Sequence, residues 1–171
     1  MKTKDIVLTG LFIALGLVLP MAFHGVPNAG SIFAPMHIPV LVCGMLLGPV
    51  CGGICGLLTP ILSSVLTGMP PAPVLPAMAV ELTVYGLMTG LLMKTLKMED
   101  SLAKNYIVLI LAMLCGRIIA GLVRALILNA GSYSMAAWVT AYFVTGLPGI
   151  GIQLVLIPAI VRALQKSGIA R

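Results

Sequence analysis

Residues 37–67 read HIPVLVCGMLLGPVCGGICGLLTPILSSVLT, a stretch of apolar and small residues without a single Lys, Arg, Asp or Glu. The Gly48-Pro49 pair divides the stretch, because Gly and Pro next to each other mark a turn. A helix that crosses a bilayer needs about 20 predominantly apolar residues. Residues 49–67 satisfy this length, and residues 35–47 are shorter and carry Pro35 and Pro39. We therefore predict two membrane spans joined by a tight turn, the first of them irregular.

The rest of the chain has the same character. Of its 171 residues, 60% are hydrophobic and 8% are charged, whereas a soluble domain carries roughly 25% charged residues. The mean hydropathy is +1.17. A soluble fold of this size could not bury so much apolar surface, because about a third of the chain's surface stays in water after folding. The composition excludes a soluble globular protein, a disordered chain, a disulfide-stapled secreted module and a nucleic-acid partner.

We predict an all-α membrane protein, a compact bundle of six transmembrane helices that forms one domain over residues 1–171. The first apolar run is long and has no Ala-x-Ala exit, so we do not expect a cleaved signal peptide. The spans are expected at about residues 5–23, 35–47, 49–67, 73–96, 105–128 and 135–164.

The net charge of +6 is unevenly distributed along the chain. Basic residues precede the first span, flank the polar segment between the fourth and fifth spans, and follow the sixth span. With an even number of spans, all three groups lie on one side of the membrane. Basic segments stay on the cytoplasmic side, so both termini are expected in the cytoplasm. The residues concerned are Lys2, Lys4, Lys94, Lys97, Lys104, Arg162, Lys166 and Arg171.

Ionisable residues inside a span are costly and indicate function by default. The clear cases are Glu81, Arg117 and Arg124, with His37 and Gln153 as milder ones. Arg117 and Arg124 are seven residues apart and share a helix face, and the expected depth of Glu81 falls between theirs. Glu81 can pair with one arginine, and the other then needs an anion or water.

Arg124 is the better candidate for the unpaired cation because it lies nearer the outer end of its span. Glu81 and Arg117 then form a structural ion pair. A guanidinium group suits a carboxylate or a phosphate, so Arg124 is expected to receive an anionic group of a ligand from outside. The alternative is that Arg124 snorkels to the interface or bonds to loop carbonyls.

Further candidate ligand contacts are expected near the outer face. Tyr85 follows Glu81 by one helical turn, and His37 lies near the start of the second span. Ordinary helix capping or loop solvation explains these side chains as well. The candidate substrate-binding residues are Arg124, His37, Glu81, Asn28, Asn129, Tyr85 and Tyr142.

Small residues at four-residue spacing let membrane helices approach closely. Gly52 with Gly56 and Gly86 with Gly90 favour packing inside the bundle. Gly10 and Ala14 on the first span fit either such packing or contact with another protein.

The sequence lacks the motifs that indicate metal binding, ATP hydrolysis or enzymatic catalysis. Cys51 and Cys55 could share a helix face, but no further metal ligand is evident nearby, so buried thiols are favoured over a metal site. The sequence has no P-loop, no HExxH and no nucleophile–base pair. We therefore expect no enzyme, no ATP hydrolysis and no cofactor bound by this chain. A stand-alone small transporter or channel remains an alternative, although no internal repeat supports it.

The chain resembles the substrate-binding S component of energy-coupling factor (ECF) transporters over essentially its whole length. The resemblance rests on a combination of segments: residues 9–16 (TGLFIALG), residues 33–41 (FAPMHIPVL), residues 47–49 (LGP) before a Gly-rich span, Glu81 with Tyr85-Gly86, and Gly116-Arg117.

The resemblance implies a subunit of the bacterial cell membrane that binds a water-soluble vitamin or precursor near the outer face. A membrane coupling protein and two cytoplasmic ATPases would be its partners, and those ATPases would use the ATP. The family's small-residue motif for coupling-protein docking, usually Ala-x-x-x-Ala, maps onto Gly10 and Ala14. The unpaired arginine favours a small carboxylate such as nicotinate or pantothenate. Riboflavin, pyridoxine, a cobalamin precursor and a queuosine precursor are the alternatives.

Overall fold

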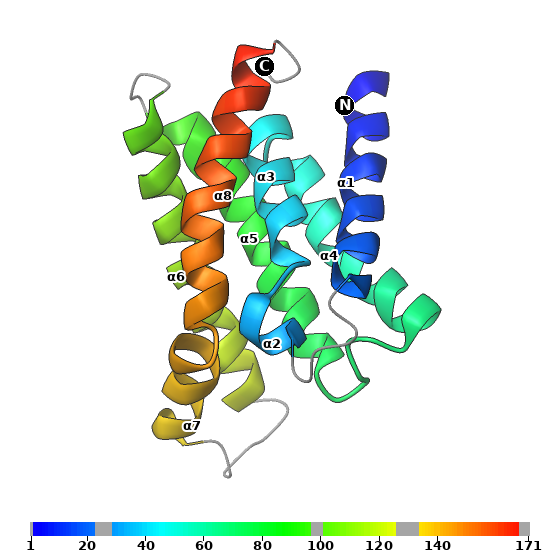
Figure 1. Ribbon diagram of the computed structural model, residues 1–171, viewed down its shortest axis with the longest axis vertical. Coiled ribbons are helices and arrows are strands. Elements are labelled where there is room, and N and C mark those ends of the chain that lie inside the picture. The colour runs from blue at the N-terminus through cyan, green and yellow to red at the C-terminus, as the bar shows by residue number, and fades with distance from the viewer. Residues whose placement is uncertain (1, 23–28, 97–100, 126–133, 168–171) are drawn as a thin grey trace.

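The computed structural model describes residues 2–22, 29–96, 101–125 and 134–167 (Figure 1). Throughout these ranges the regular secondary structure is helical. The elements are α1 (Thr3–Met21), α2 (Ala29–Phe33), α3 (His37–Leu47), α4 (Pro49–Thr67), α5 (Leu75–Thr95), α6 (Leu102–Val123), α7 (Met135–Val139), a π-helix (Thr140–Val144) and α8 (Leu147–Lys166).

Five helices, α1, α4, α5, α6 and α8, are long and apolar enough to cross a membrane. The sixth apolar helix, α3, has 11 residues and is about 16 Å long at 1.5 Å per residue. It lies in the centre of the bundle, and nine of its residues are buried. Helix α3 contacts α1, α4, α5 and α8, and Figure 1 shows it between α1 and α8. Because other helices cover α3, its short length exposes little of its backbone to lipid.

The start of α6 shows how a capping residue sets a helix boundary. The sequence places the fifth span from about residue 105, whereas α6 begins at Leu102. Ser101 is the N-cap, and its side-chain oxygen accepts a hydrogen bond from the backbone N–H of Lys104 at 3.3 Å. This bond satisfies one of the free N–H groups of the first turn. The polar segment before the fifth span therefore contributes the first turn of α6.

The last predicted span differs from the structure. The sequence predicts one helix over residues 135–164, but α7 and the π-helix end before Gly146, and α8 starts at Leu147. Pro148 occupies the first turn of α8, where its missing N–H removes no intrahelical hydrogen bond. Pro148 therefore starts a new helix. Residues 135–144 thus form a separate segment at the end of the bundle.

Glycines bring α4 and α5 into backbone contact. A Cβ atom added at Gly86 would meet the carbonyl group of Gly52, and one added at Gly52 would meet the carbonyl group of Gly86. Added Cβ atoms at Gly56 and Gly90 would likewise collide with the backbone of Leu82 and of the Gly48-Pro49 turn. These glycine pairs therefore pack inside the bundle.

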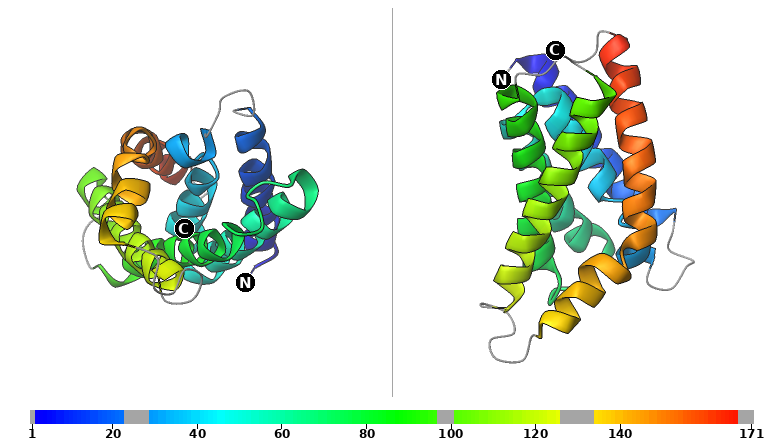
Figure 2. Two further views of the ribbon diagram at one scale, coloured as in Figure 1. Left: turned by 90° about the horizontal axis from the view of Figure 1, so that it is seen from below. Right: turned by 90° about the vertical axis from the view of Figure 1, so that its left-hand side faces the viewer.

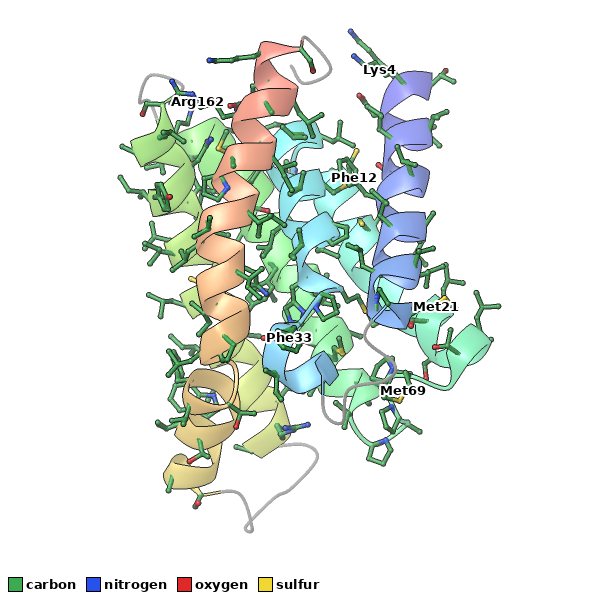
Figure 3. The ribbon with its side chains drawn as sticks, viewed as in Figure 1. Lys4, Phe12, Met21, Phe33, Met69 and Arg162 are labelled. Atoms are coloured by element: carbon green, nitrogen blue, oxygen red, sulfur yellow. The ribbon has the colours of Figure 1, made fainter. Side chains whose placement is uncertain are left out.

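The two ends of the bundle differ in charge. The first residues of α1 and the last residues of α8 lie at the same end, together with the end of α5 and the start of α6 (Figures 1 and 2). Figure 3 labels Lys4 and Arg162 there. We call this end, with Lys2, Lys4, Lys94, Lys104, Arg162 and Lys166, the basic end. Helices α2 and α7 lie toward the opposite end, which we call the distal end.

Candidate functional site

A buried polar network connects three helices in the half of the bundle nearer the distal end. It consists of His37 on α3, Glu81 and Tyr85 on α5, and Arg117 on α6. All four are at least 93% buried, with exposed fractions of 7%, 7%, 0% and 6% respectively. Such groups are costly to place in an apolar interior unless they are paired. Their contacts with one another meet this cost.

The Tyr85 hydroxyl group is the centre of the polar network. It donates a hydrogen bond to Glu81 Oε1 at 2.8 Å and accepts one from Arg117 Nε at 3.1 Å. The carboxylate and the guanidinium are therefore linked through one phenol oxygen, where the sequence predicts a direct ion pair. Their opposite charges still compensate each other over this short path, because the surrounding medium has a low dielectric constant.

Two further contacts complete the surroundings of Glu81 and Tyr85. His37 Nε2 lies 3.7 Å from Glu81 Oε1. The His37 and Tyr85 rings are 5.5 Å apart between centroids and tilted by 59°. Gly116 leaves room for the tyrosine, since a Cβ atom at that position would collide with the Tyr85 ring. The absence of a side chain at Gly116 thus allows Tyr85 to reach across from α5 to Arg117.

The segment formed by α7 and the π-helix covers Arg117 from the other side. The Phe143 ring centroid lies 5.5 Å from Arg117 Cζ, a cation–π distance. Trp138 donates from Nε1 to the Arg117 carbonyl oxygen at 3.3 Å and stacks edge-on against Phe143 at 5.2 Å. Gly121 accommodates the indole, because a Cβ atom there would meet it. The sequence shows no periodic signal for these contacts, and an interfacial anchoring role for Trp138 is what its type suggests.

Gln153 extends the buried polar groups to α8. Its side chain is fully buried, and Nε2 donates to the Ala34 carbonyl oxygen at 3.4 Å. The same carbonyl accepts the backbone N–H of His37 at 3.1 Å. Ala34 has a φ of 46°, in the left-handed region, where the chain turns from α2 into α3. One carbonyl group thus holds Gln153 next to the start of α3.

Arg124 lies apart from the polar network. The α-helix α6 ends at Val123 and Arg124 is its C-cap residue. Residues 126–133 lie outside the described residues, so the expected depth of Arg124 below the outer end of its span stays a prediction. The Arg124 side chain is half-buried. Within the described ranges, no residue makes an ion pair or a hydrogen bond with the Arg124 side chain. The structure therefore links Arg117, and not Arg124, to Glu81.

Three predicted contacts cannot be placed. Asn28 and Asn129 lie outside the described residues. Tyr142 belongs to the π-helix, but its side chain is not described. Of the seven candidate substrate-binding residues, the structure brings His37, Glu81 and Tyr85 together and sets Arg124 apart from them.

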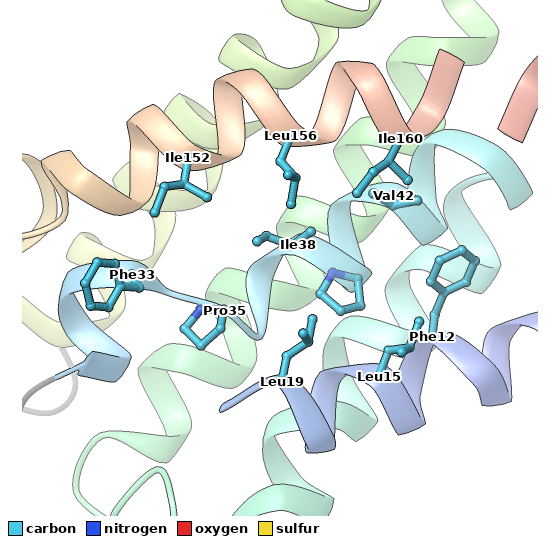
Figure 4. A pocket seen from close by; sticks show the side chains of 11 residues that line it. Phe12, Leu15, Leu19, Phe33, Pro35, Ile38, Val42, Ile152, Leu156 and Ile160 are labelled. Carbon is cyan, nitrogen blue, oxygen red and sulfur yellow. The ribbon is translucent and has the colours of Figure 1, made fainter. Parts of the chain in front are cut away.

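A separate cavity of about 320 Å³ lies between α1, α3 and α8 (Figure 4). Every residue that lines it is apolar, so it offers no hydrogen bond to a polar ligand and does not fit an anion. The lining residues are Phe12, Leu15, Leu19, Phe33, Pro35, Ile38, Pro39, Val42, Ile152, Leu156 and Ile160.

The cysteines do not form a metal centre within the described part of the chain. Cys43, Cys51 and Cys55 are buried free thiols. Among the described residues, no group of three or more His, Cys, Asp or Glu side chains could hold a metal ion. The polar network is therefore the feature of the described interior best suited to polar chemistry.

These features define an integral membrane protein with a buried polar site near one end of a helical bundle. A family model for the substrate-specific component of ECF transporters matches residues 4–161. The chain belongs to this family, as its sequence resemblance predicts. Comparisons with curated proteins and with solved structures gave no match. The protein is thus the substrate-specific subunit of an ECF importer, a multi-pass membrane protein whose partner ATPases use ATP.

Proposed function

We propose that this S component binds a small carboxylate, of the class of nicotinate or pantothenate, at the distal end of the bundle. Arg124 receives the carboxylate, and the polar network formed by His37, Glu81, Tyr85 and Arg117 lies deeper in the bundle. The distal end faces the outside of the cell, and both termini lie in the cytoplasm. The positive-inside rule supports this orientation. Apart from Arg117 and Arg124, all the described Lys and Arg residues lie at the basic end.

The proposal that the substrate is a carboxylate rests on the surroundings of Arg124. Arg117 is already balanced by Glu81 through Tyr85. Arg124 has no anionic partner among the described residues, and its side chain is half-buried. A half-buried guanidinium gains most from a carboxylate that it can bond in a bidentate manner.

The position of Arg124 also has a structural explanation. A cation at the C-terminal end of a helix interacts favourably with the helix dipole, by roughly 0.3 to 1 kcal/mol. This explains why an arginine is tolerated at the end of α6 without a ligand. If Arg124 served only to interact with the helix dipole, its replacement would change stability slightly and leave ligand affinity unchanged. Binding measurements therefore separate this structural role from the ligand-binding role.

Replacement of Arg124 tests the proposed substrate class. A hydrogen-bonded charge contributes roughly 1.5 to 3 kcal/mol, so Arg124→Ala should raise the Kd of a bound carboxylate about 10- to 100-fold. The Kd is measured by isothermal titration calorimetry in detergent, with nicotinate and pantothenate as ligands.

Arg162→Ala is the matched control, because Arg162 is an exposed arginine at the basic end. It should leave the Kd unchanged. Equal Kd values for wild type and Arg124→Ala would remove Arg124 from the site.

We further propose that α1 docks on the membrane coupling protein through Gly10 and Ala14. Both residues are exposed on the surface of the bundle, and a Cβ atom added at Gly10 would meet no atom within 4 Å. This differs from Gly52 and Gly86, which pack inside the bundle. A small-residue surface that none of the described helices covers suits close approach by a helix of another protein.

A further inference from the structure

The apolar cavity between α1, α3 and α8 is a groove that opens to the surface of the bundle (Figure 4). Phe12 and Val42 line its buried part and are 9% and 2% exposed, whereas Leu15 and Leu156 line its open part and are 42% and 44% exposed. Helices α1 and α8 each pack on α3 and make few contacts with each other. Because both helices are long and apolar enough to cross a membrane, the open side of the groove faces lipid and not water.

The dimensions of the groove suit a single hydrocarbon chain. Its lining residues on α8 run from Ile152 to Ile160, a length of about 12 Å at 1.5 Å per residue. The volume of 320 Å³, spread over that length, leaves a mean cross-section of about 27 Å², the area of a circle roughly 6 Å wide. A helix with its side chains is about 10 to 12 Å across and does not fit inside. Unfilled space forfeits dispersion contacts, so an acyl chain of the surrounding bilayer is favoured to fill the groove.

One basic residue lies in line with the groove at the basic end. Lys4 precedes Leu15 by eleven residues, which is close to three full turns, so both residues lie on one face of α1. Leu8, which lies between them on the same face, is half-buried and apolar. Figure 3 shows Lys4 on the side of α1 that is turned toward α8. Lys4 is exposed, and it makes no ion pair within the described ranges.

The spacing between Lys4 and the groove matches the depth of one leaflet. Lys4 and Leu15 are about 16 Å apart along the axis of α1, and half of a hydrocarbon core of about 30 Å is about 15 Å. A phospholipid whose phosphate lies beside Lys4 therefore extends its acyl chain to the level of Leu15. Lysine at the membrane surface attracts anionic headgroups, so the charge at this end of the groove favours an anionic lipid.

We propose that the groove between α1 and α8 binds one acyl chain of an anionic phospholipid, whose phosphate pairs with Lys4. The lipid belongs to the leaflet at the basic end. The groove is separate from Arg124 and from the polar network, so the proposal holds whatever the transported substrate is. Gly10 and Ala14 lie on another face of α1, and a bound lipid therefore leaves the proposed docking surface free.

Native mass spectrometry of the full chain tests the occupant of the groove. The protein is reconstituted into liposomes of equal parts phosphatidylglycerol and phosphatidylcholine, which share a phosphate and differ in net charge, and is then extracted in a mild detergent. One phosphatidylglycerol retained per chain is the expected result. A lipid-free chain, or equal retention of the two lipids, overturns the proposal. A lipid-free dimer also overturns it, because a second copy then covers the groove.

Two neighbouring substitutions on α8 test the groove itself. Leu156→Trp places a large ring in the groove and should abolish retention of the lipid. Val155→Trp is the matched control, because Val155 is 71% exposed and does not line the groove, and it should retain the lipid. Thermal unfolding verifies that both variants are folded. Retention by Leu156→Trp, or loss from both variants, would place the lipid elsewhere.

Lys4→Ala tests the headgroup contact without a change in the apolar interior. It should lower the ratio of bound phosphatidylglycerol to phosphatidylcholine about fivefold, the contribution of one lysine near an anionic surface. The total amount of bound lipid should stay the same. Arg162→Ala removes another exposed basic residue at the basic end and should preserve the ratio. An unchanged ratio in Lys4→Ala overturns the pairing of the phosphate with Lys4.

Discussion

At the scale of single residues, one phenol oxygen determines how two buried charges are tolerated. The Tyr85 hydroxyl donates to Glu81 and accepts from Arg117, which a hydroxyl group can do at once because it has one hydrogen and two lone pairs. Its position depends on Gly116, which leaves space for the ring. The tyrosine therefore acts as a bridge, and its loss exposes both ions to an apolar interior.

We predict that Tyr85→Phe destabilises the bundle by about 2 to 3 kcal/mol, since two hydrogen bonds to charged groups are lost and nothing replaces them. The ring and its packing against His37 are kept, so the effect reports on the hydroxyl group. Thermal unfolding in detergent, followed by near-UV circular dichroism, measures the change. Tyr106→Phe, at a residue on α6 that is 39% exposed, should have no effect. Equal unfolding midpoints for both variants would contradict the bridging role.

The residue types of the polar network could be predicted from the sequence, but their pairing could not. Ionisable residues within apolar runs are visible in one dimension, and Glu81, Arg117, His37 and Tyr85 were all expected to matter. Arg117 and Arg124 share a face of α6, so which of them balances Glu81 depends on how α6 is positioned along its axis relative to α5. The contribution of Phe143 and Trp138 to Arg117 depends on where a separate segment folds back, and no spacing in the sequence encodes that position.

At the scale of elements, the contact between α4 and α5 is made by backbone against backbone. Gly52 and Gly86 face each other so closely that a single added methyl group on either would collide with the carbonyl group of the other. In lipid the hydrophobic effect does not drive helices together, so van der Waals contact at such small residues matters more than in water. Helix α5 carries Glu81 and Tyr85, and this contact therefore also positions the polar network.

Gly86→Ala should separate α4 from α5 and destabilise the protein by about 1 to 3 kcal/mol, the usual cost of overpacking. The change also moves Tyr85, so the Kd of the bound ligand should rise together with the loss of stability. Unfolding midpoints and ligand titrations of the same preparations give both quantities. Gly151→Ala is the control, because a Cβ atom there meets no atom within 4 Å. A stable Gly86→Ala variant would show that the two helices can move apart at little cost.

Element boundaries were predictable where local chemistry sets them. The Gly48-Pro49 turn starts α4 where the sequence indicates, since Gly48 adopts a φ of 96° that favours glycine and Pro49 occupies the first turn. The division between α7 and α8 was not predictable, because Pro148 is compatible both with a kink and with a new helix. The packing of Trp138 and Phe143 against α6 favours the second arrangement.

At the scale of the whole molecule, most of the described residues lie in apolar helices, and the family to which the chain belongs works with partner ATPases that use ATP. The exposed side of α1 combines Gly10 and Ala14 with large apolar residues, including Val7, Leu11 and Val18. A surface of this kind is compatible with lipid and with a partner helix alike. Its role in coupling is therefore a question for a transport assay.

We predict that Gly10→Trp and Ala14→Trp abolish uptake into liposomes that contain the coupling protein and both ATPases, because a large ring prevents close helix approach. Ligand affinity should stay at the wild-type value, as neither residue contacts the polar network. Ile110→Trp, at an exposed residue of α6, should transport normally. Liposomes with the wild-type chain alone should show no concentrative uptake. Normal uptake by both α1 variants would place the docking surface elsewhere.

The sequence by itself determined that this is a helical membrane protein, that its basic residues collect on one side, and that it belongs with the S components. The first two conclusions depend on composition, on the length of apolar runs and on the placement of basic residues, and the third on a combination of short segments that resemble the family. All of these are properties of local sequence. Only the tertiary structure decided that the short helix α3 lies in the centre of the bundle, that Arg117 is the arginine linked to Glu81, and that Gln153 and His37 each retain a buried side-chain atom without a hydrogen bond. Such features arise where helices distant in sequence meet, and their relative rotation and depth are set by packing across the whole bundle.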